Sequence, residues 1–241
     1  MKKQISDAVD MTIKRIFTAE EINALTNLQK RKRVFDYLFQ INEYDFELLN
    51  DILNCKPRDY DSEILAPLLK GKGVCNGISY AYKIILERLG IYVMLIGSNL
   101  QMDIRELAKL GEFGIDINKV RRGIDGTAKL SHMFTLVKND DGYYSFDDIT
   151  CAILNPEQRE NFFNYDRKGC ERNQQVDLIG VPSELLNYIA DKESSDIEKA
   201  IEGIWLDKQT GFLKIPEMIK RYEESKAKSE MERLDELTWL K

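Results

Sequence analysis

Apolar side chains recur at helical spacing through the first part of the chain. The pattern predicts helices over residues 3–17 and 19–54. In the second segment, Val34, Leu38 and Ile41 repeat at intervals of four and three, which places them on one face of a helix. These helices are therefore expected to be amphipathic.

The clearest helix is predicted over residues 75–89. Its apolar stripe consists of Ile78, Ala81, Tyr82, Ile85, Leu86 and Leu89. Gly90 follows at the position where a glycine commonly ends a helix. Upstream, the segment EILAPLLKG predicts a short helix or turn that contains Pro67.

Strand patterns come later in the chain. Residues 91–97, IYVMLIG, are rich in β-branched side chains and predict a buried strand. Residues 98–131 form a long polar connection with one predicted helix, which is typical of a lid or a small subdomain. Residues 132–150 carry strand patterns on both sides of an NDDG turn and predict an antiparallel hairpin. The expected class is α+β, with a core over residues 1–154 and a mostly helical extension over 155–241; the alternative is a single domain.

Charge narrows the range of partners. The formal net charge is -6 and the sequence pI about 5.1, which argues against a nucleic-acid surface because phosphate binding needs clustered Lys and Arg. The one dense basic run, Lys30–Arg33, lies within a helical pattern, so a solvated helix face is favoured over an acidic partner.

The sequence also bears on location. It contains no run of about 18 apolar residues, the length that a membrane span requires. Its first residues lack the apolar segment of a secretory signal. We expect a cytoplasmic protein that does not enter a membrane, with specialised export as the alternative. A charged amphipathic helix is predicted near the C-terminus; we expect it to dock on the core, with contact to a partner protein as the alternative.

Cysteine and histidine counts limit the chemistry. The four cysteines are Cys55, Cys75, Cys151 and Cys170, and they show no CxxC spacing. We interpret them as reduced thiols. His132 is the single histidine, so a zinc site built from two or three histidines is impossible. We expect neither a metal nor another cofactor, and any histidine base must be His132.

Cys75 lies at the point where a polar turn becomes a helix, between Gly73 and Gly77. Unpaired amides and the macrodipole at a helix N-terminus stabilise a thiolate and lower the pKa of such a cysteine. The same amides can stabilise the oxyanion that forms when a thiolate attacks a carbonyl. The two glycines allow close approach of the backbone, and we expect them to contact the substrate. A buried, inert cysteine is the competing interpretation.

His132 opens the first strand of the predicted hairpin, and Asp147 and Asp148 end the second. In an antiparallel pair, the start of one strand lies beside the end of the other. A carboxylate there would orient the imidazole while its other nitrogen takes a proton from a thiol. The order of a helix-start cysteine, a strand-start histidine and a strand-end aspartate favours this triad over a histidine without a role.

These segments resemble the transglutaminase-like superfamily, which has a papain-like fold and a Cys–His–Asp triad. GKGVCNGISYAYKIILERLGI is similar to the catalytic helix of that family, HMFTLV…DGYYSFDDIT to its hairpin, and RVFDYLFQINEYD to its pre-catalytic helix. The resemblance covers residues 30–153. It implies Cys75 as nucleophile, His132 as general base and acid, and an aspartate as the group that orients the histidine.

The resemblance leaves the aspartate open. Counting from His132 without gaps favours Asp147, whereas the D-x-T signature favours Asp148, and adjacent strand residues face opposite ways. We prefer Asp147. Phe134 occupies a position where the family favours tryptophan, and we expect it to contact the substrate.

The resemblance implies acyl transfer at a carboxamide of a protein or peptide, through a thioester. Hydrolysis of the protease or amidase type is the preferred outcome. The alternatives are a cross-linking or deamidating transglutaminase, an arylamine N-acetyltransferase with the same triad, and a non-catalytic binding protein that keeps the fold.

Overall fold

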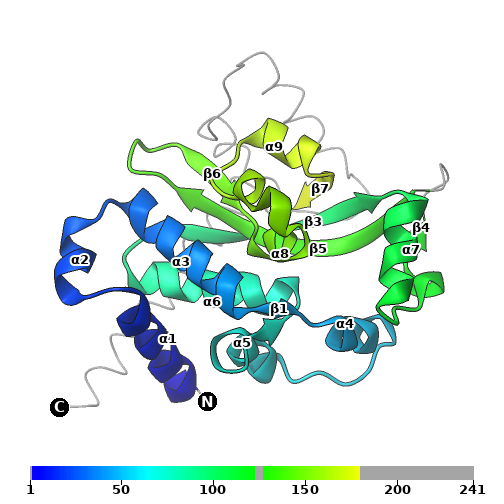
Figure 1. Ribbon diagram of the computed structural model, residues 1–241, viewed down its shortest axis with the longest axis horizontal. Coiled ribbons are helices and arrows are strands. Elements are labelled where there is room, and N and C mark those ends of the chain that lie inside the picture. The colour runs from blue at the N-terminus through cyan, green and yellow to red at the C-terminus, as the bar shows by residue number, and fades with distance from the viewer. Residues whose placement is uncertain (1, 123–126, 180–241) are drawn as a thin grey trace, which may run out of the picture. The chain divides into compact units, whose positions relative to one another are not determined.

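The computed structural model describes residues 2–122 and 127–179, which form helices packed on a curved sheet (Figure 1). The helices are α1 (Lys2–Ile16), α2 (Ala19–Ala24), α3 (Asn27–Ile41), α4 (Phe46–Leu53), α5 (Tyr60–Leu69), α6 (Cys75–Arg88), α7 (Ile104–Glu112), α8 (Ile149–Leu154) and α9 (Arg167–Arg172), with 3-10 turns η1 (Ile117–Lys119) and η2 (Pro156–Phe162). The strands are β1 (Glu43–Tyr44), β2 (Lys72–Gly73), β3 (Val93–Met102), β4 (Arg121–Arg122), β5 (Ala128–Lys138), β6 (Tyr144–Asp147) and β7 (Gln175–Ile179). The predicted α+β class is confirmed.

The segment predicted as one helix over 19–54 consists of three helices and a short strand. Helix α3 begins at a capping box, in which the side chain of Thr26 accepts from the amide of Gln29 while the side chain of Gln29 accepts from the amide of Thr26. Helix α4 begins after Asp45, whose carboxylate accepts from the amide of Leu48. These capped helix starts divide a segment that apolar spacing alone had predicted as a single helix.

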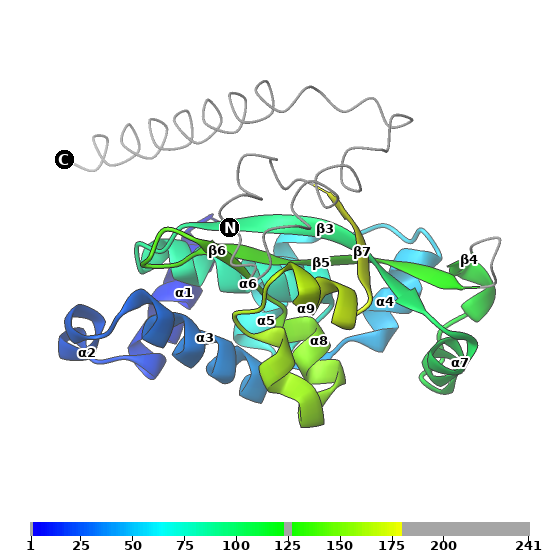
Figure 2. The same ribbon diagram turned by 90° about the horizontal axis from the view of Figure 1, so that it is seen from above.

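Helix α6 is the centre of the packing. It begins at Cys75, and Gly90 beyond its end has a φ of +79°, the left-handed conformation that glycine adopts readily. Strands β3 and β5 contact it on one side, and helices α1, α3, α5 and α8 surround the rest. In Figure 1, α6 lies below β3 and β5, and Figure 2 shows these two strands side by side from above. The predicted helix over 75–89 is therefore confirmed, with its apolar residues in the main core.

The larger sheet has the order β4-β5-β3-β7, and β6 pairs with β5 as well. Strands β5 and β6 form the predicted antiparallel hairpin, with Thr135 opposite Asp147. Strand β3 is longer than predicted and pairs with β5 from Val93 to Met102. The long connection after it is correspondingly shorter than 98–131, and it contains the predicted helix, here α7.

A second, smaller apolar cluster joins α4 and α7 with the ends of β3 and β5, at the right of Figure 1. Its buried members are Leu49, Val74, Leu107, Leu110, Ile115, Val120, Ala128 and Leu130. We call it the α4–α7 cluster. Because Val74 directly precedes α6, this cluster holds the point at which the helix of Cys75 begins.

The predicted boundary near residue 155 does not divide the part of the chain that the structure describes. Residues 155–179 belong to the same compact unit as the core, since β7 is hydrogen-bonded to β3 and Phe162 is buried in the main core. The predicted amphipathic helix near the C-terminus lies outside the described residues. Among the residues that are described, no helix is long and apolar enough to cross a membrane.

Candidate functional site

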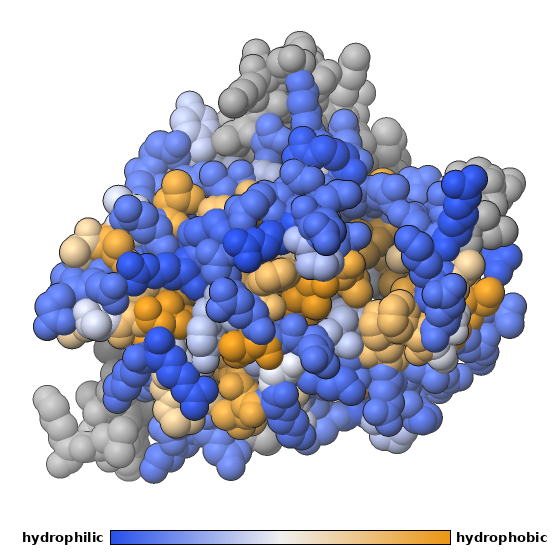
Figure 3. Space-filling model, viewed as in Figure 1, coloured by the Kyte–Doolittle hydropathy of each residue, from blue (hydrophilic) through white to orange (hydrophobic). Residues whose placement is uncertain are grey.

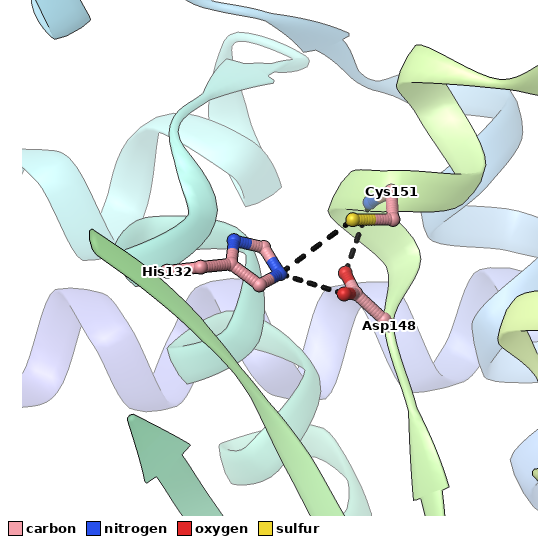
Figure 4. Close-up of side chains that lie close together, drawn as sticks. All are labelled: His132, Asp148 and Cys151. Atoms are coloured by element: carbon pink, nitrogen blue, oxygen red, sulfur yellow. Dashed lines mark hydrogen bonds and ion pairs between the residues drawn. The ribbon is translucent and has the colours of Figure 1, made fainter. Parts of the chain in front are cut away.

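His132 meets Asp148, not Asp147. The Nε2 atom of His132 lies 2.6 Å from Oδ2 of Asp148, and both side chains are buried (Figure 4). Strand register explains the choice. Thr135 pairs with Asp147, so odd residues of β5 share a face with odd residues of β6, and even residues share the other face. The preference for Asp147 as the partner of His132 is therefore wrong, and the alternative, Asp148, is the residue in contact.

Asp147 points to the opposite side of β6, where it is buried against α3 and α6. The guanidinium of Arg31 donates to both of its carboxylate oxygens, at 2.8 Å for Nη2, and the hydroxyl of Tyr82 donates at 2.8 Å. Arg31 is fully buried, which corrects the prediction that the basic run Lys30–Arg33 is a solvated face. Arg31 stands three and seven residues before Val34 and Leu38, on the apolar side of α3, and this spacing was the missed signal.

Two donors other than His132 hold Asp148, which follows the last residue of β6. It caps α8, because its Oδ1 accepts from the amide of Cys151 at 2.9 Å. The side-chain amide of Gln175 donates to Oδ2, and Gln175 in turn accepts from the hydroxyl of Tyr165 at 2.8 Å. Hydrogen bonds to the charged form favour a carboxylate, and second-layer bonds of this kind fix the orientation of a histidine partner.

The pKa of His132 is raised well above its usual range. Burial alone acts in the other direction, because it disfavours the charged imidazolium. The negative charge of Asp148 and its hydrogen bond to Nε2, together with the neighbouring thiol of Cys151, outweigh that effect. An imidazolium at His132 is therefore stabilised by a fixed carboxylate.

Cys151 is a residue of this cluster that the sequence analysis did not identify. Its Sγ lies 3.7 Å from Nε2 of His132, and its side chain is buried. Burial and then the charge of Asp148 raise the pKa of the Cys151 thiol to about 12, so the group is neutral at physiological pH. The signal was available: Asp148 stands three residues before Cys151, the spacing of a carboxylate cap and the third residue of a helix.

Cys75 is the first residue of α6 and is half-buried. The residue before it is Val74, whose side chain cannot accept a hydrogen bond, so the first-turn amides have no side-chain cap from that position. Ser79 and Tyr82 lie on the same face of α6 as Cys75, because they follow it by four and seven residues.

These two residues show which part of β5 that face meets. The hydroxyl of Ser79 donates to the carbonyl of Met133 at 2.9 Å. Tyr82 reaches Asp147, which pairs with Thr135. This face of α6 therefore meets the sheet at Met133 of β5 and at Asp147 of β6.

The pKa of Tyr44 is influenced by Cys75 and by the residues around His132. Burial raises the pKa of its hydroxyl, and among charged groups the strongest effect comes from Cys75, with smaller raising effects from Cys151 and Asp148 and a lowering effect from His132. Both cysteines, the histidine and its carboxylate therefore influence the pKa of Tyr44. Tyr44 on β1 pairs with Gly73 on β2, two residues before Cys75.

Gly73, Gly77 and Phe134, which were expected to contact a substrate, pack against other parts of the protein. A Cβ at Gly77 would lie 2.4 Å from the carbonyl oxygen of Glu63, and one at Gly73 would lie 2.8 Å from the ring of Pro67, so both glycines allow α5 to approach α6. Phe134 is fully buried, with its ring stacked on the imidazole of His132 at 5.8 Å. It supports the histidine from within the core. Contact of these three positions with a substrate stays a prediction.

His132, Asp148 and Cys151 also offer one nitrogen, one oxygen and one sulfur within 4.8 Å of one another. Such a set suits a borderline-soft divalent ion such as Zn²⁺. Nε2 of His132 would then have to give up its contact with the carboxylate in favour of the ion. The three side chains can therefore either hold the proton between His132 and Asp148 or bind a metal ion, but not both at once.

No protein-family model matches the chain, and no curated protein matches it. Among solved structures, it is similar to one described as "Crystal structure of a TGase", with 16% sequence identity and a TM-score of 0.41. That match covers 61% of this chain and 31% of the other, so the chain spans less than a third of that protein's length.

Proposed function

We propose that this protein is a transglutaminase-like cysteine enzyme that transfers acyl groups from a carboxamide of a protein or peptide, with hydrolysis as the outcome. Cys75 is the nucleophile, His132 the base and acid, and Asp148 the group that orients the histidine. The observation that carries the proposal is the buried contact between Nε2 of His132 and Asp148. It leaves Nδ1 directed away from both Asp148 and Cys151 (Figure 4) and available to a thiol.

The proposed reaction follows from this arrangement. Nδ1 takes the proton of the Cys75 thiol, and the thiolate adds to the carbonyl carbon while the carbonyl electrons move to oxygen. First-turn amides of α6 stabilise that oxyanion. The imidazolium then protonates the leaving amine, the C–N bond breaks, and a thioester forms. Water, deprotonated by Nδ1, attacks the thioester and releases the acid and the thiol of Cys75.

The raised pKa of His132 suits this chemistry in a specific way. An imidazolium stabilised by Asp148 favours the ion pair of thiolate and imidazolium over the neutral pair, as in other cysteine nucleophiles that have a histidine partner. Cys151 is a poor competitor for the role, because burial raises its pKa to about 12 and hides its sulfur from a substrate. Its proposed role is to fill the space behind the imidazole.

The test is alkylation by iodoacetamide, followed cysteine by cysteine with mass spectrometry from pH 5 to 9. We expect Cys75 to react faster than Cys55, an exposed thiol in the same protein, with the difference greatest below pH 7. The difference should disappear in His132→Ala and persist in Cys151→Ala. Equal pH profiles for Cys75 and Cys55 in the unmodified protein would reject the proposal and favour a binding protein that keeps the fold.

A second experiment distinguishes hydrolysis from cross-linking and deamidation by the group that is released from the substrate and by the group that attacks the thioester. Incubation with a glutamine-containing protein and a fluorescent primary amine would attach the amine if the thioester meets amines more readily than water. Release of a new peptide amine without attachment of the fluorescent amine is the expected result, whereas release of ammonia would indicate deamidation.

A further inference from the structure

Three aromatic rings form a continuous row that begins beside the candidate site. The ring of Tyr44 contacts that of Phe46 edge-on, with centroids 4.9 Å apart, and Phe46 stacks on Phe113 with centroids 4.2 Å apart and planes within 3°. Tyr44 and Phe46 are half-buried, whereas Phe113 is 57% exposed. Parallel stacking of this kind fixes the orientation of an apolar surface that is open to solvent.

The row is built on a rigid support. Tyr44 and Phe46 pack on the α4–α7 cluster, and Phe113 directly follows the last residue of α7. Helix α7 begins at a capping box of Asp103 and Glu106, which fixes its start. Figure 3 shows apolar surface over the region where β1, α4 and α7 lie in Figure 1. The rings are thus held in place from behind and exposed at one end.

The inner end of the row lies beside the strand that leads to the candidate nucleophile. Tyr44 pairs with Gly73, and Val74, which precedes Cys75, is a buried member of the α4–α7 cluster. The hydroxyl of Tyr44 also senses the charge of Cys75 more strongly than that of any other group acting on it. The apolar row therefore begins next to the residues that lead into Cys75.

We propose that Tyr44, Phe46 and Phe113 form a specificity subsite that binds an aromatic side chain of the substrate, next to the carboxamide attacked by Cys75. This inference rests on the proposed function for the identity of the attacked group. A flat aromatic side chain continues a row of stacked rings, and transfer of its surface from water is favourable.

Charged side chains near the three rings add a second preference, for substrates that lack a carboxylate. Each ring has an exposed glutamate as its neighbour in sequence: Glu43 beside Tyr44, Glu47 beside Phe46, and Glu112 beside Phe113. Lys72 lies opposite Glu43 across β1 and β2, but the glutamates outnumber it, and this excess of negative charge disfavours a carboxylate on the substrate. The substrate class is therefore a peptide with an aromatic residue, and without an acidic one, beside the reactive carboxamide.

The test uses chloroacetamides as probes, because they report access to Cys75 without a known substrate. Three probes carry a phenyl ring on a one-, two- or three-carbon tether, and N-ethylchloroacetamide is the reference without a ring. Rates of alkylation are measured for Cys75 and for Cys55 in the full chain. We expect at least one phenyl probe to alkylate Cys75 about tenfold faster than the reference, with saturation, and Cys55 to show no preference.

Variants identify the rings responsible. Phe113→Ala should remove most of the preference of Cys75 for phenyl probes, whereas Tyr143→Ala, which removes another exposed ring in the β5–β6 turn, should leave it unchanged. An equal phenyl-to-ethyl ratio for Cys75 and Cys55, or a ratio unaffected by Phe113→Ala, overturns the subsite.

The two proposals fail in different ways. Loss of the subsite changes the ratio between probes. Loss of the proposed function leaves the rate with the ethyl reference the same in His132→Ala as in the unmodified protein. A preference for phenyl probes at a thiol that His132 does not activate would support the subsite and reject the catalytic role.

Discussion

Asp147 and Asp148 are adjacent, equally buried carboxylates that have different partners. Asp147 faces α3 and α6 and is neutralised by Arg31. Asp148 faces the other side of β6 and meets His132, a group that can gain or lose a proton near neutral pH. The charge of the first pair is permanent and that of the second can change. The last residue of β6 is therefore a structural carboxylate, and the residue after it, the N-cap of α8, is a candidate chemical one.

The surroundings reinforce this difference. Asp147 also accepts from Tyr82 and from the amide of Asn164, which joins α6 and the segment after η2 to the pair. Asp148 accepts from Gln175 and from the amide of Cys151, and neither of these donors carries a charge. Only in the second case is the partner of opposite charge an ionisable histidine. The comparison can be tested by removing each carboxylate or its partner in turn.

The largest expected effect is on activity in Asp148→Asn. Loss of an orienting carboxylate from a triad lowers the rate of acyl transfer by about 10⁴-fold, because the imidazole then has the wrong tautomer and its cation is no longer stabilised. The measurement is turnover of a fluorogenic peptide amide that carries phenylalanine beside the scissile bond. The pH dependence of Cys75 alkylation should lose its advantage at low pH in the same variant.

Asp147→Asn is the matched control, since it makes the same chemical change one residue earlier. Its activity per folded molecule should fall far less than that of Asp148→Asn. A greater fall in Asp147→Asn would reverse the assignment of the two carboxylates and return Asp147 to the chemical role.

The second effect is on stability, in Arg31→Met. Removal of Arg31 leaves the charge of Asp147 buried without its partner, which costs about 3–5 kcal/mol in the free energy of unfolding. Urea unfolding followed by circular dichroism measures it. The double variant Arg31→Met/Asp147→Leu should recover much of the loss, because it replaces both charges by apolar groups. If the free energy of unfolding of Arg31→Met lies within about 1 kcal/mol of that of the unmodified protein, the buried ion pair does not stabilise the fold as proposed.

The sequence predicted much of this arrangement because several elements depend on local patterns. The stripe of α6, its glycine stop and the turn between β5 and β6 are short-range signals, and all are confirmed. They place Cys75 at the start of a helix and His132 in the first strand of a hairpin without knowledge of the rest of the fold. The choice between Asp147 and Asp148 failed because it depends on strand register. A shift by one residue moves a side chain to the other face.

Other parts depend on contacts between distant segments. Gln175 reaches Asp148 only because β7 joins the sheet beside β3, some forty residues after the hairpin begins. The glycines near Cys75 were predicted to admit a substrate, but the space is taken by α5. Arg31 could have been found, since helical spacing puts it on the apolar side of α3. The position was missed because the run Lys30–Arg33 was interpreted by its charge and not by the helical position of each residue.

The smallest expected effect is a dependence of the free energy of unfolding on pH, which should come from the pair of His132 and Asp148 and not from the pair of Arg31 and Asp147. The pKa of folded His132 is raised above its usual value near 6.5, so its protonation stabilises the fold fully below that pH. As pH rises from 6.5 towards the raised pKa, the unfolded chain loses the proton first, and the free energy of unfolding falls by up to about 1.4 kcal/mol per pH unit. Urea unfolding at intervals from pH 6 to 8.5 measures this slope.

Two variants show which pair causes the slope. His132→Gln has no imidazolium to stabilise, so its free energy of unfolding should vary much less across this range. Tyr82→Phe, which removes a donor from Asp147 instead, should be less stable by about 1 kcal/mol at every pH and keep the slope of the unmodified protein. Arg31 stays charged throughout, so its pair with Asp147 contributes no slope. A slope that survives in His132→Gln would mean that neither the histidine nor Asp148 titrates as this geometry requires.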